Sequence, residues 1–244
     1  MRQPLARLAQ MTYPGRLIAI GRNASGESNV VIYAVTGRSA SSQARTLVLE
    51  SKAVWTKPTD PEILNMGNPD LLIYPALVFG RGIAVSNGKQ TADIDAGSCQ
   101  SPVQALERAL ESWSYEPDAP VFTPRISGCL LPSNRAALSL IRRAIGGETL
   151  RFFFEFPLEA GQGKMISTYS GENKDPLPSF HGEPLDLELQ EHSAEATAEA
   201  VDAALGPRRG EKDFRVSVAC VFAPASDMTD FRCHIINHQE RTRK

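Results

Sequence analysis

Short runs of β-branched and aromatic residues recur along the whole chain, and they constrain the fold more than any other feature. Arg16–Gly21 and Asn29–Thr36 are two such runs, and the polar segment between them contains Gly26, which predicts a β-hairpin. The same pattern predicts further strands at Thr46–Glu50, Ala53–Thr56, Ile83–Ser86, Arg125–Leu131, Leu150–Phe156, Met165–Tyr169, Phe214–Phe222 and Phe231–Ile236. We therefore expect a chain rich in β-sheet.

Two further segments carry local signals. Ala136–Ile145 fits a helix by the spacing of Leu138 and Ile141, but it also alternates as a strand does, and we favour the strand. Asn87-Gly88 directly follows a predicted strand and is a dipeptide typical of tight turns.

Capping residues mark two helices. Ser101 is a good N-cap, and Pro102 suits the first helical position. The second helix is predicted at Ser193–Leu205, where Gly206-Pro207 ends it. Its expected inner face consists of small residues, namely Ala196, Ala200, Val201 and Ala204. About nine strands and two or three helices predict an α+β fold, as either a β-sandwich with outer helices or a mixed open sheet.

Composition limits the classes of protein that fit. With 244 residues, 42% of them hydrophobic, the chain can bury a sizeable core, and we expect a single domain over residues 1–244. The net charge of −2 argues against a nucleic-acid binder, which usually carries a basic excess. No signal peptide or membrane-spanning run is visible, so a cytoplasmic protein without membrane contact is expected.

The cysteines and histidines do not have the spacing of a metal site. The four cysteines include no CxxC pair, and the four histidines include no HExxH motif. We therefore expect no bound metal and four reduced thiols. Cys129 and Cys220 lie in apolar strand-like runs, where they are expected to fill the core.

Three polar segments could carry chemistry. Thr36–Arg45 offers two guanidinium groups, three serine hydroxyls and a glycine directly after a strand, a set that suits a phosphate group. Glu116 and Asp118 flank a proline and precede Arg125, so a carboxylate there could act as a base or orient a substrate amide. Tyr74 lies before a proline that favours extended backbone, and its phenol could stabilise an oxyanion.

Each of these segments also has a purely structural interpretation. Thr36–Arg45 lacks the glycine spacing of a Walker or dinucleotide-binding loop and could be a solvated hairpin loop. The Glu116 segment could be a salt-bridged loop, and Tyr74 could be a half-buried core residue. The residues alone leave both interpretations open.

Taken together, these motifs resemble a known family. They occur in the order YPGR, TGRSASSQAR, NP followed by YPA, SNG, and YEPDAPVFTPRISG, beginning at Tyr13 and ending at Gly128. This order is similar to that of the archaeal-type, stand-alone IMP cyclohydrolases, a family that also has bacterial members. The resemblance covers about Tyr13 to Gly171, and the C-terminal third matches only loosely.

The resemblance implies a fold and a reaction. The fold would be a four-layer αββα sandwich like that of the Ntn hydrolases, without self-cleavage. Residue 2 is Arg, so removal of the initiator methionine would not expose a nucleophilic side chain. The reaction would close the formylated aminoimidazole carboxamide ribotide (FAICAR) to IMP and water, without metal, folate or other cofactor. The partners would be this small-molecule substrate and other copies of the chain.

The resemblance also implies roles for individual residues. Tyr74 would stabilise the oxyanion or protonate the departing hydroxide, and Glu116 would orient or deprotonate the carboxamide. Arg38 would act beside them on the phosphate or the imidazole substituents. Substrate binding would fall to Ser39, Ser42, Gln43, Arg45, Asn87, Asp118 and Arg125.

Two alternatives come from other functional classes. An Ntn-like amide hydrolase would need an activated nucleophile, for which Ser98 and Cys99 qualify by residue type although no base is evident beside them. The second alternative is a purine-ribotide-binding protein that has kept the binding pocket but lost the catalytic activity.

Overall fold

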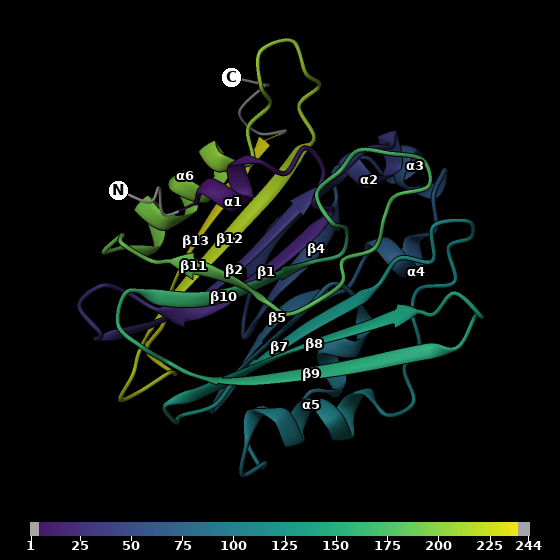
Figure 1. Cartoon of the computed structure of the whole chain (residues 1–244). Coiled ribbons are helices and arrows are strands. Elements are labelled where there is room, and N and C mark those ends of the chain that lie inside the picture. The colour runs from purple at the N-terminus through teal and green to yellow at the C-terminus, as the bar shows by residue number, and fades with distance from the viewer. Residues whose placement is uncertain (1–4, 239–244) are drawn as a thin grey trace.

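The computed structural model describes residues 5–238, and within them the strands form two antiparallel sheets (Figure 1). The six-stranded sheet has the order β11 (Leu185–Glu188), β10 (Gln162–Ser167), β1 (Arg16–Arg22), β2 (Ser28–Thr36), β12 (Arg215–Pro224) and β13 (Arg232–Asn237). The seven-stranded sheet has the order β3 (Arg45–Glu50), β4 (Ala53–Pro58), β5 (Pro75–Phe79), β6 (Ile83–Ser86), β7 (Arg125–Leu130), β8 (Arg135–Arg143) and β9 (Thr149–Pro157). The predicted α+β class is confirmed.

Hydrophobic residues of both sheets share one core cluster. Ile18 and Tyr33 of the six-stranded sheet and Val85 and Leu138 of the seven-stranded sheet all belong to it, and each is at most 1% exposed. Burying a large apolar side chain contributes about 1.5–3 kcal/mol, so this shared cluster is a main source of stability. The inward-facing residues alternate along each strand, as the period of two requires.

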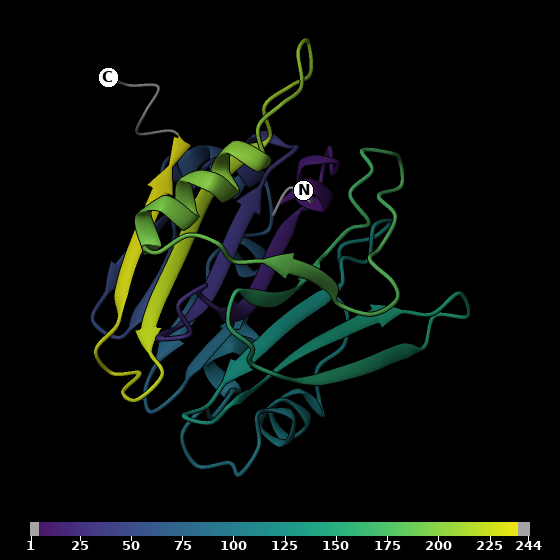
Figure 2. The same cartoon turned by 60° about the vertical axis from the view of Figure 1, so that its left-hand side comes forward.

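Two smaller clusters join the sheets to the longer helices. Cys220 on β12 packs with Ala198 and Val201 of α6 (Ala194–Ala204), whereas Cys129 on β7 packs with Leu106 of α5 (Pro102–Leu110). Figure 2 shows α6 against the six-stranded sheet and α5 beside the seven-stranded one. Both cysteines are fully buried, which confirms that they fill the core.

Both predicted helices are confirmed, as is the predicted N-cap Ser101, and the structure shows that Ser193 caps the second helix. The Ser101 hydroxyl accepts the N–H of Gln104, and the Ser193 hydroxyl accepts the N–H of Ala196. The predicted inner face of α6 is largely wrong, since of its four alanine and valine positions only Val201 is fully buried. The buried residues are Ala194, Thr197, Ala198, Val201 and Asp202. Asp202 is buried because it pairs with Arg215 and His238, a contact that apolar periodicity does not reveal.

Most strand predictions are confirmed, including the β1–β2 hairpin and the assignment of Ala136–Ile145 to a strand, β8. Strands β5 and β11 were missed. The predicted tight turn at Asn87-Gly88 is wrong, because Gly88 has an extended φ of −171° and leads into a 3₁₀ helix at Lys89–Asp93. Four short helices complete the described chain, namely α1 (Ala6–Ala9), α2 (Ala40–Gln43), α3 (Pro61–Asn65) and α4 (Pro69–Leu72). None of its helices is long and apolar enough to cross a membrane.

Candidate active site

Polar side chains from both sheets meet in the interior. Arg16 begins β1, Glu116 lies in the loop before β7, and their ion pair joins the two sheets with an Nη2–Oε1 distance of 2.7 Å. The Arg16 guanidinium also acts electrostatically on the phenols of Tyr33 and Tyr74. We call the following buried residues the Arg16–Glu116 cluster: Arg16, Tyr33, Tyr74, Asn87, Glu116 and Arg125.

Glycine at position 15 makes this placement of Arg16 possible. Gly15 has a φ of +75°, which L-residues with a side chain rarely adopt. A Cβ atom there would lie 2.2 Å from Oγ1 of Thr168 and 2.6 Å from the ring of Tyr169. The Thr168 hydroxyl in turn accepts the N–H of Arg16, which fixes the start of β1.

The Glu116 carboxylate is held on one oxygen. Oε1 accepts from Arg16 and from Nδ2 of Asn87 at 3.0 Å, and the Glu116 side chain is 3% exposed. Among the described residues no donor reaches the other oxygen, Oε2. Burial raises the pKa of Glu116 above the usual carboxyl range, while the charges of Arg16 and Arg125 oppose that shift. A carboxylate with a raised pKa and one unoccupied oxygen can accept a proton from a weak acid.

Asn87 is locked in a single orientation. Its Nδ2 donates to Glu116 and to the carbonyl of Pro124 at 3.0 Å, while its Oδ1 accepts from the backbone N–H of Ile126 and from Gln90. All of its hydrogen-bonding capacity toward protein is therefore in use. In this arrangement Asn87 positions Glu116.

Arg125 lies beside this network and bonds to it through Gln90. Its Nη1 donates to Oε1 of Gln90 at 3.0 Å, its Nε donates to the carbonyl of Ser114, and its guanidinium lies 4.8 Å from the ring centroid of Trp113. Burial lowers the pKa of Arg125, while the charge of Glu116 raises it.

Two phenols form a hydrogen-bonded pair next to Arg16. The hydroxyls of Tyr33 on β2 and Tyr74 before β5 lie 2.7 Å apart, and both side chains are at most 1% exposed. Burial raises the pKa of Tyr33 well above its usual value, so this phenol keeps its proton at neutral pH. The Tyr74 backbone is fixed by Thr56, whose hydroxyl accepts the Tyr74 N–H at 2.8 Å and donates to its carbonyl. The pair can therefore donate a proton to a group placed beside it.

Thr36–Arg45 is not an open hairpin loop, because it contains helix α2. Ser39 and Ser42 form a reciprocal capping box, in which each hydroxyl bonds the other residue's backbone. The side-chain amide of Gln43 donates to the carbonyl of Gly37 at 3.0 Å. These side chains thus shape the loop that carries Arg38 and Arg45.

Arg38 and Arg45 lie at the border of the cluster. Both guanidinium groups act electrostatically on the Tyr13 phenol, as Arg16 does, although burial has the larger effect and raises the pKa of Tyr13. Arg45 is 2% exposed, and its Nη1 is buried with no hydrogen-bond partner among the described residues. Arg38 is one-third exposed and pairs with Asp175 at 2.8 Å. Three guanidinium groups therefore act on one phenol, although Arg16 and Arg38 are each paired with a carboxylate.

Asp118 braces the loop that carries Glu116. Its carboxylate accepts the N–H of Thr123 at 2.6 Å and the Thr123 hydroxyl at 2.5 Å. That hydroxyl also lies 2.7 Å from the phenol of Tyr169, whose pKa burial raises to about 12. Both carboxylate oxygens of Asp118 are therefore used within the protein.

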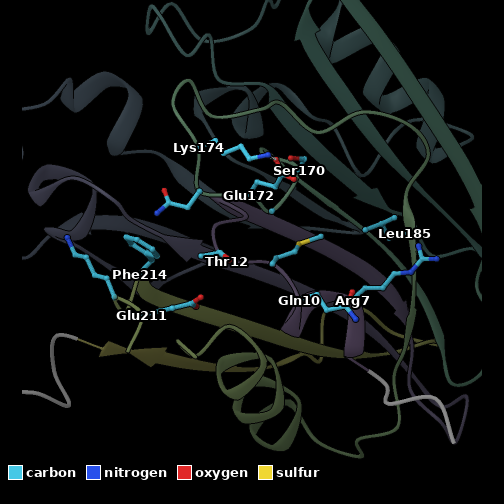
Figure 3. Close-up of a pocket in the computed structure, with 13 residues that line it drawn as sticks. Arg7, Gln10, Thr12, Ser170, Glu172, Lys174, Leu185, Glu211 and Phe214 are labelled. Atoms are coloured by element: carbon cyan, nitrogen blue, oxygen red, sulfur yellow. Dashed lines mark ion pairs between the residues drawn. The ribbon is translucent and has the colours of Figure 1, made fainter. Parts of the chain in front are cut away.

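The groove drawn in Figure 3 is a separate feature with a volume of about 720 Å³. Arg7, Thr12, Lys174 and Phe214 are among its lining residues, and none of the predicted site residues lines it. It adjoins the site through the segment that follows Ser170, because Arg38 donates to the carbonyl of Lys174 at 3.4 Å.

The nucleophile candidates of the hydrolase alternative lie elsewhere. The Ser98 hydroxyl bonds the carboxylate of Asp95, and Cys99 lies 3.9 Å from a guanidinium nitrogen of Arg108 on α5. No histidine among the described residues bonds either side chain. The described residues also contain no group of three or more His, Cys, Asp or Glu placed to hold a metal ion.

Sequence reasoning identified only part of this arrangement. The structure brings Tyr74, Asn87, Glu116 and Arg125 together, with Arg38 and Arg45 at the border. Sequence reasoning missed the roles of Arg16, Tyr33, Gln90 and Tyr169. Arg16 had a signal, since it ends the YPGR motif, whereas Tyr33 was indistinguishable from a core residue of its strand.

Comparison with known proteins agrees with the order of motifs. No curated protein matches the chain. The sequence pattern that defines the IMP cyclohydrolase-like protein family matches residues 13–224, a range that includes every residue of the Arg16–Glu116 cluster. The chain belongs to the IMP cyclohydrolase-like protein family.

Proposed function

We propose that the protein is an IMP cyclohydrolase, which closes FAICAR to IMP with loss of water in purine biosynthesis. The observation that carries this proposal is the combination of a buried carboxylate, a buried phenol pair and three nearby arginines, Arg16, Arg38 and Arg45. The reaction needs an acceptor for an amide proton, a donor to an oxyanion and an anchor for a phosphate. Glu116 and Tyr74 of the cluster supply the first two in this proposal, and Arg38 and Arg45 at its border supply the third.

The first step forms the new carbon–nitrogen bond. The carboxamide nitrogen attacks the formyl carbon of the same molecule, so the protein only has to hold the two arms in a reactive rotamer. As the bond forms, the formyl carbonyl electrons move onto oxygen. Glu116 orients the carboxamide and accepts one of its protons at Oε2, while Arg16 and Asn87 hold Oε1. The Tyr74 phenol donates to the developing oxyanion, while its oxygen accepts a hydrogen bond from the Tyr33 phenol.

The second step removes water. The carbinol oxygen leaves as water, and the formamide nitrogen loses its proton as the ring C=N bond forms. The carboxamide and the formamide each lose one proton, and these two protons balance the two hydrogens of the departing water, so the reaction needs no cofactor. In this proposal the Tyr74 hydroxyl, hydrogen-bonded to Tyr33, is the donor to the departing hydroxide.

Arg38 and Arg45 are the proposed phosphate ligands. Arg45 has a buried Nη1 without a protein partner among the described residues, and a phosphate oxygen would satisfy it. Arg38 would exchange its exposed pair with Asp175 for the phosphate. Ser39, Ser42, Gln43 and Asp118 act in this proposal by shaping the loops, because the structure already uses their polar atoms.

We further propose that the described residues form the αββα sandwich of the Ntn-like folds as a single domain. The core cluster shared by the two sheets supports this arrangement, as do the separate clusters that attach α6 and α5.

The direct test is incubation of the purified protein with FAICAR, with chromatographic detection of IMP. Formation of IMP at a catalytic rate is expected. Tight binding of FAICAR without turnover would contradict the proposal in favour of a binding protein. Loss of activity on thiol labelling of Cys99 would favour the hydrolase mechanism instead.

A further inference from the structure

Strand β9 forms one edge of the seven-stranded sheet. It pairs with β8 over nine residues, from Thr149 to Pro157, without a bulge. Figures 1 and 2 both show β9 along the margin of its sheet. No strand among the described residues pairs with its outer side. The outer row of backbone N–H and C=O groups is therefore available for hydrogen bonding.

The other edges of the two sheets are shorter, and one is capped. On β3, the Leu47 N–H donates to the side chain of Asn237 and the Leu47 carbonyl accepts from it, both at 3.0 Å. Strand β11 has only four residues, two of them acidic. Proteins usually protect sheet edges by such devices, because a long and regular free edge pairs with another chain. Within β9 a proline occurs only at its last position.

The sequence of β9 is complementary to itself. It reads TLRFFFEFP, with Phe153 at its centre. If two copies pair antiparallel about Phe153, Arg151 of each lies opposite Glu155 of the other, and Phe152 lies opposite Phe154. Moving the register by two residues in either direction separates the charges. The charge pattern therefore selects one two-fold symmetric register.

The exposure of β9 agrees with such an interface. Phe152 is 37% exposed although it is a large apolar residue, and it stacks on Phe154 with ring centroids 6.5 Å apart. On the other face, an open hollow of about 440 Å³ between α5 and β9 is lined in part by Arg151 and Phe153. Both faces can therefore accept side chains from an added strand.

We propose that β9 is a self-association edge, through which two copies of this chain join their seven-stranded sheets into one continuous sheet. The partner is a second copy, because an unrelated strand would not carry the matching Glu155 and Arg151. The proposal concerns a surface away from the Arg16–Glu116 cluster and does not depend on the reaction catalysed there.

A charge swap tests the register. Within one chain Arg151 and Glu155 are four residues apart on a strand, about 13 Å, so they do not pair with each other. Sedimentation analysis of the wild-type protein is expected to show a dimer or a multiple of it. Arg151→Glu and Glu155→Arg alone should each raise the dimer dissociation constant at least about 10-fold, because like charges then face each other. The double swap should restore dimerisation.

Controls separate the interface from general effects. Lys164→Glu reverses a charge on the six-stranded sheet and should leave the dimer unchanged. Glu155 also pairs with Arg135 in its own chain, so circular dichroism should verify that each variant folds. Phe152→Ser, at an exposed position, should raise the dissociation constant even if a charge variant fails to fold. The proposal would be overturned if the wild type were monomeric or if Phe152→Ser dimerised with unchanged affinity. It would also be overturned if the double swap folded but did not restore dimerisation.

Discussion

Replacing Arg16 with methionine is expected to destabilise the fold severely, because the buried Glu116 carboxylate then loses its cation. The paired side chains are 11% and 3% exposed, and their atoms lie 2.7 Å apart. Removing one partner of a buried ion pair costs about 3–5 kcal/mol. In a chain of this size each kcal/mol lowers Tm by about 2–4 °C, so calorimetry at neutral pH should show a fall of about 6–20 °C.

The pH dependence of this loss has a definite sign. Burial already raises the pKa of Glu116 in the presence of Arg16, and removing the guanidinium raises it further. A carboxyl whose folded pKa exceeds its unfolded value binds more protons in the native state. Its contribution to stability is present at low pH and is lost as the pH rises through the folded pKa. The deficit of the Arg16→Met variant should therefore shrink as the pH is lowered.

Two comparisons isolate the ion pair. Arg22→Met removes an arginine that bonds the neutral side chains of Asn29 and Asn134, and it should lower Tm far less. The double variant Arg16→Met, Glu116→Gln removes both charges and should recover much of the lost stability. An Arg16→Met variant as stable as Arg22→Met, or a double variant no more stable than Arg16→Met, would refute this reasoning.

Three further predictions concern the site. Tyr74→Phe should lower kcat about 10²–10³-fold in a FAICAR ring-closure assay, because it removes the oxyanion donor; an unchanged kcat would remove Tyr74 from the chemistry. Arg38→Ala should raise KM about 10-fold, equivalent to ~1.4 kcal/mol of phosphate binding, with a smaller change in kcat; wild-type kinetics would discard that role. Gly15→Ala should lower Tm by about 2–8 °C, because a side chain at positive φ costs ~1–2 kcal/mol, and overlap of its Cβ with Thr168 adds to that cost. Calorimetry that finds no change in Tm would show that the backbone there is adaptable.

Local signals in the sequence were sufficient to predict the helices and strands that have clear boundaries. The capping hydroxyl of Ser101 marked the start of α5, and Gly206-Pro207 marked the end of α6. Two β-branched runs around a polar segment marked the β1–β2 hairpin. Strand β5 was missed because it begins with Pro75 and lacks polar alternation, so its apolar run had no strand signature. Strand β11 was missed because two of its four residues are acidic. Asn87-Gly88 did not form a hairpin turn, because the Asn87 side chain bonds residues far along the chain.

The site was predictable only where a polar residue stood out from its local pattern. Glu116 and Arg38 lie in polar loops, so their residue types alone made them candidates. Tyr33 lies among apolar residues of β2, and its partner Tyr74 is 41 residues away, so no local pattern could show the phenol pair. The Arg16–Glu116 pair spans 100 residues and depends on how the two sheets meet. Such long-range pairings require the tertiary structure.

The most direct test of the account is the rate of FAICAR ring closure, followed by ultraviolet absorbance, in the wild type and two matched variants. Glu116→Gln keeps the shape of the buried side chain but removes its proton acceptor, whereas Glu159→Gln makes the same change at an exposed loop position. We predict that the wild type and Glu159→Gln form IMP at equal rates and that Glu116→Gln is slower by about 10²-fold or more. Equal turnover by Glu116→Gln, or no IMP from the wild type, would contradict the account.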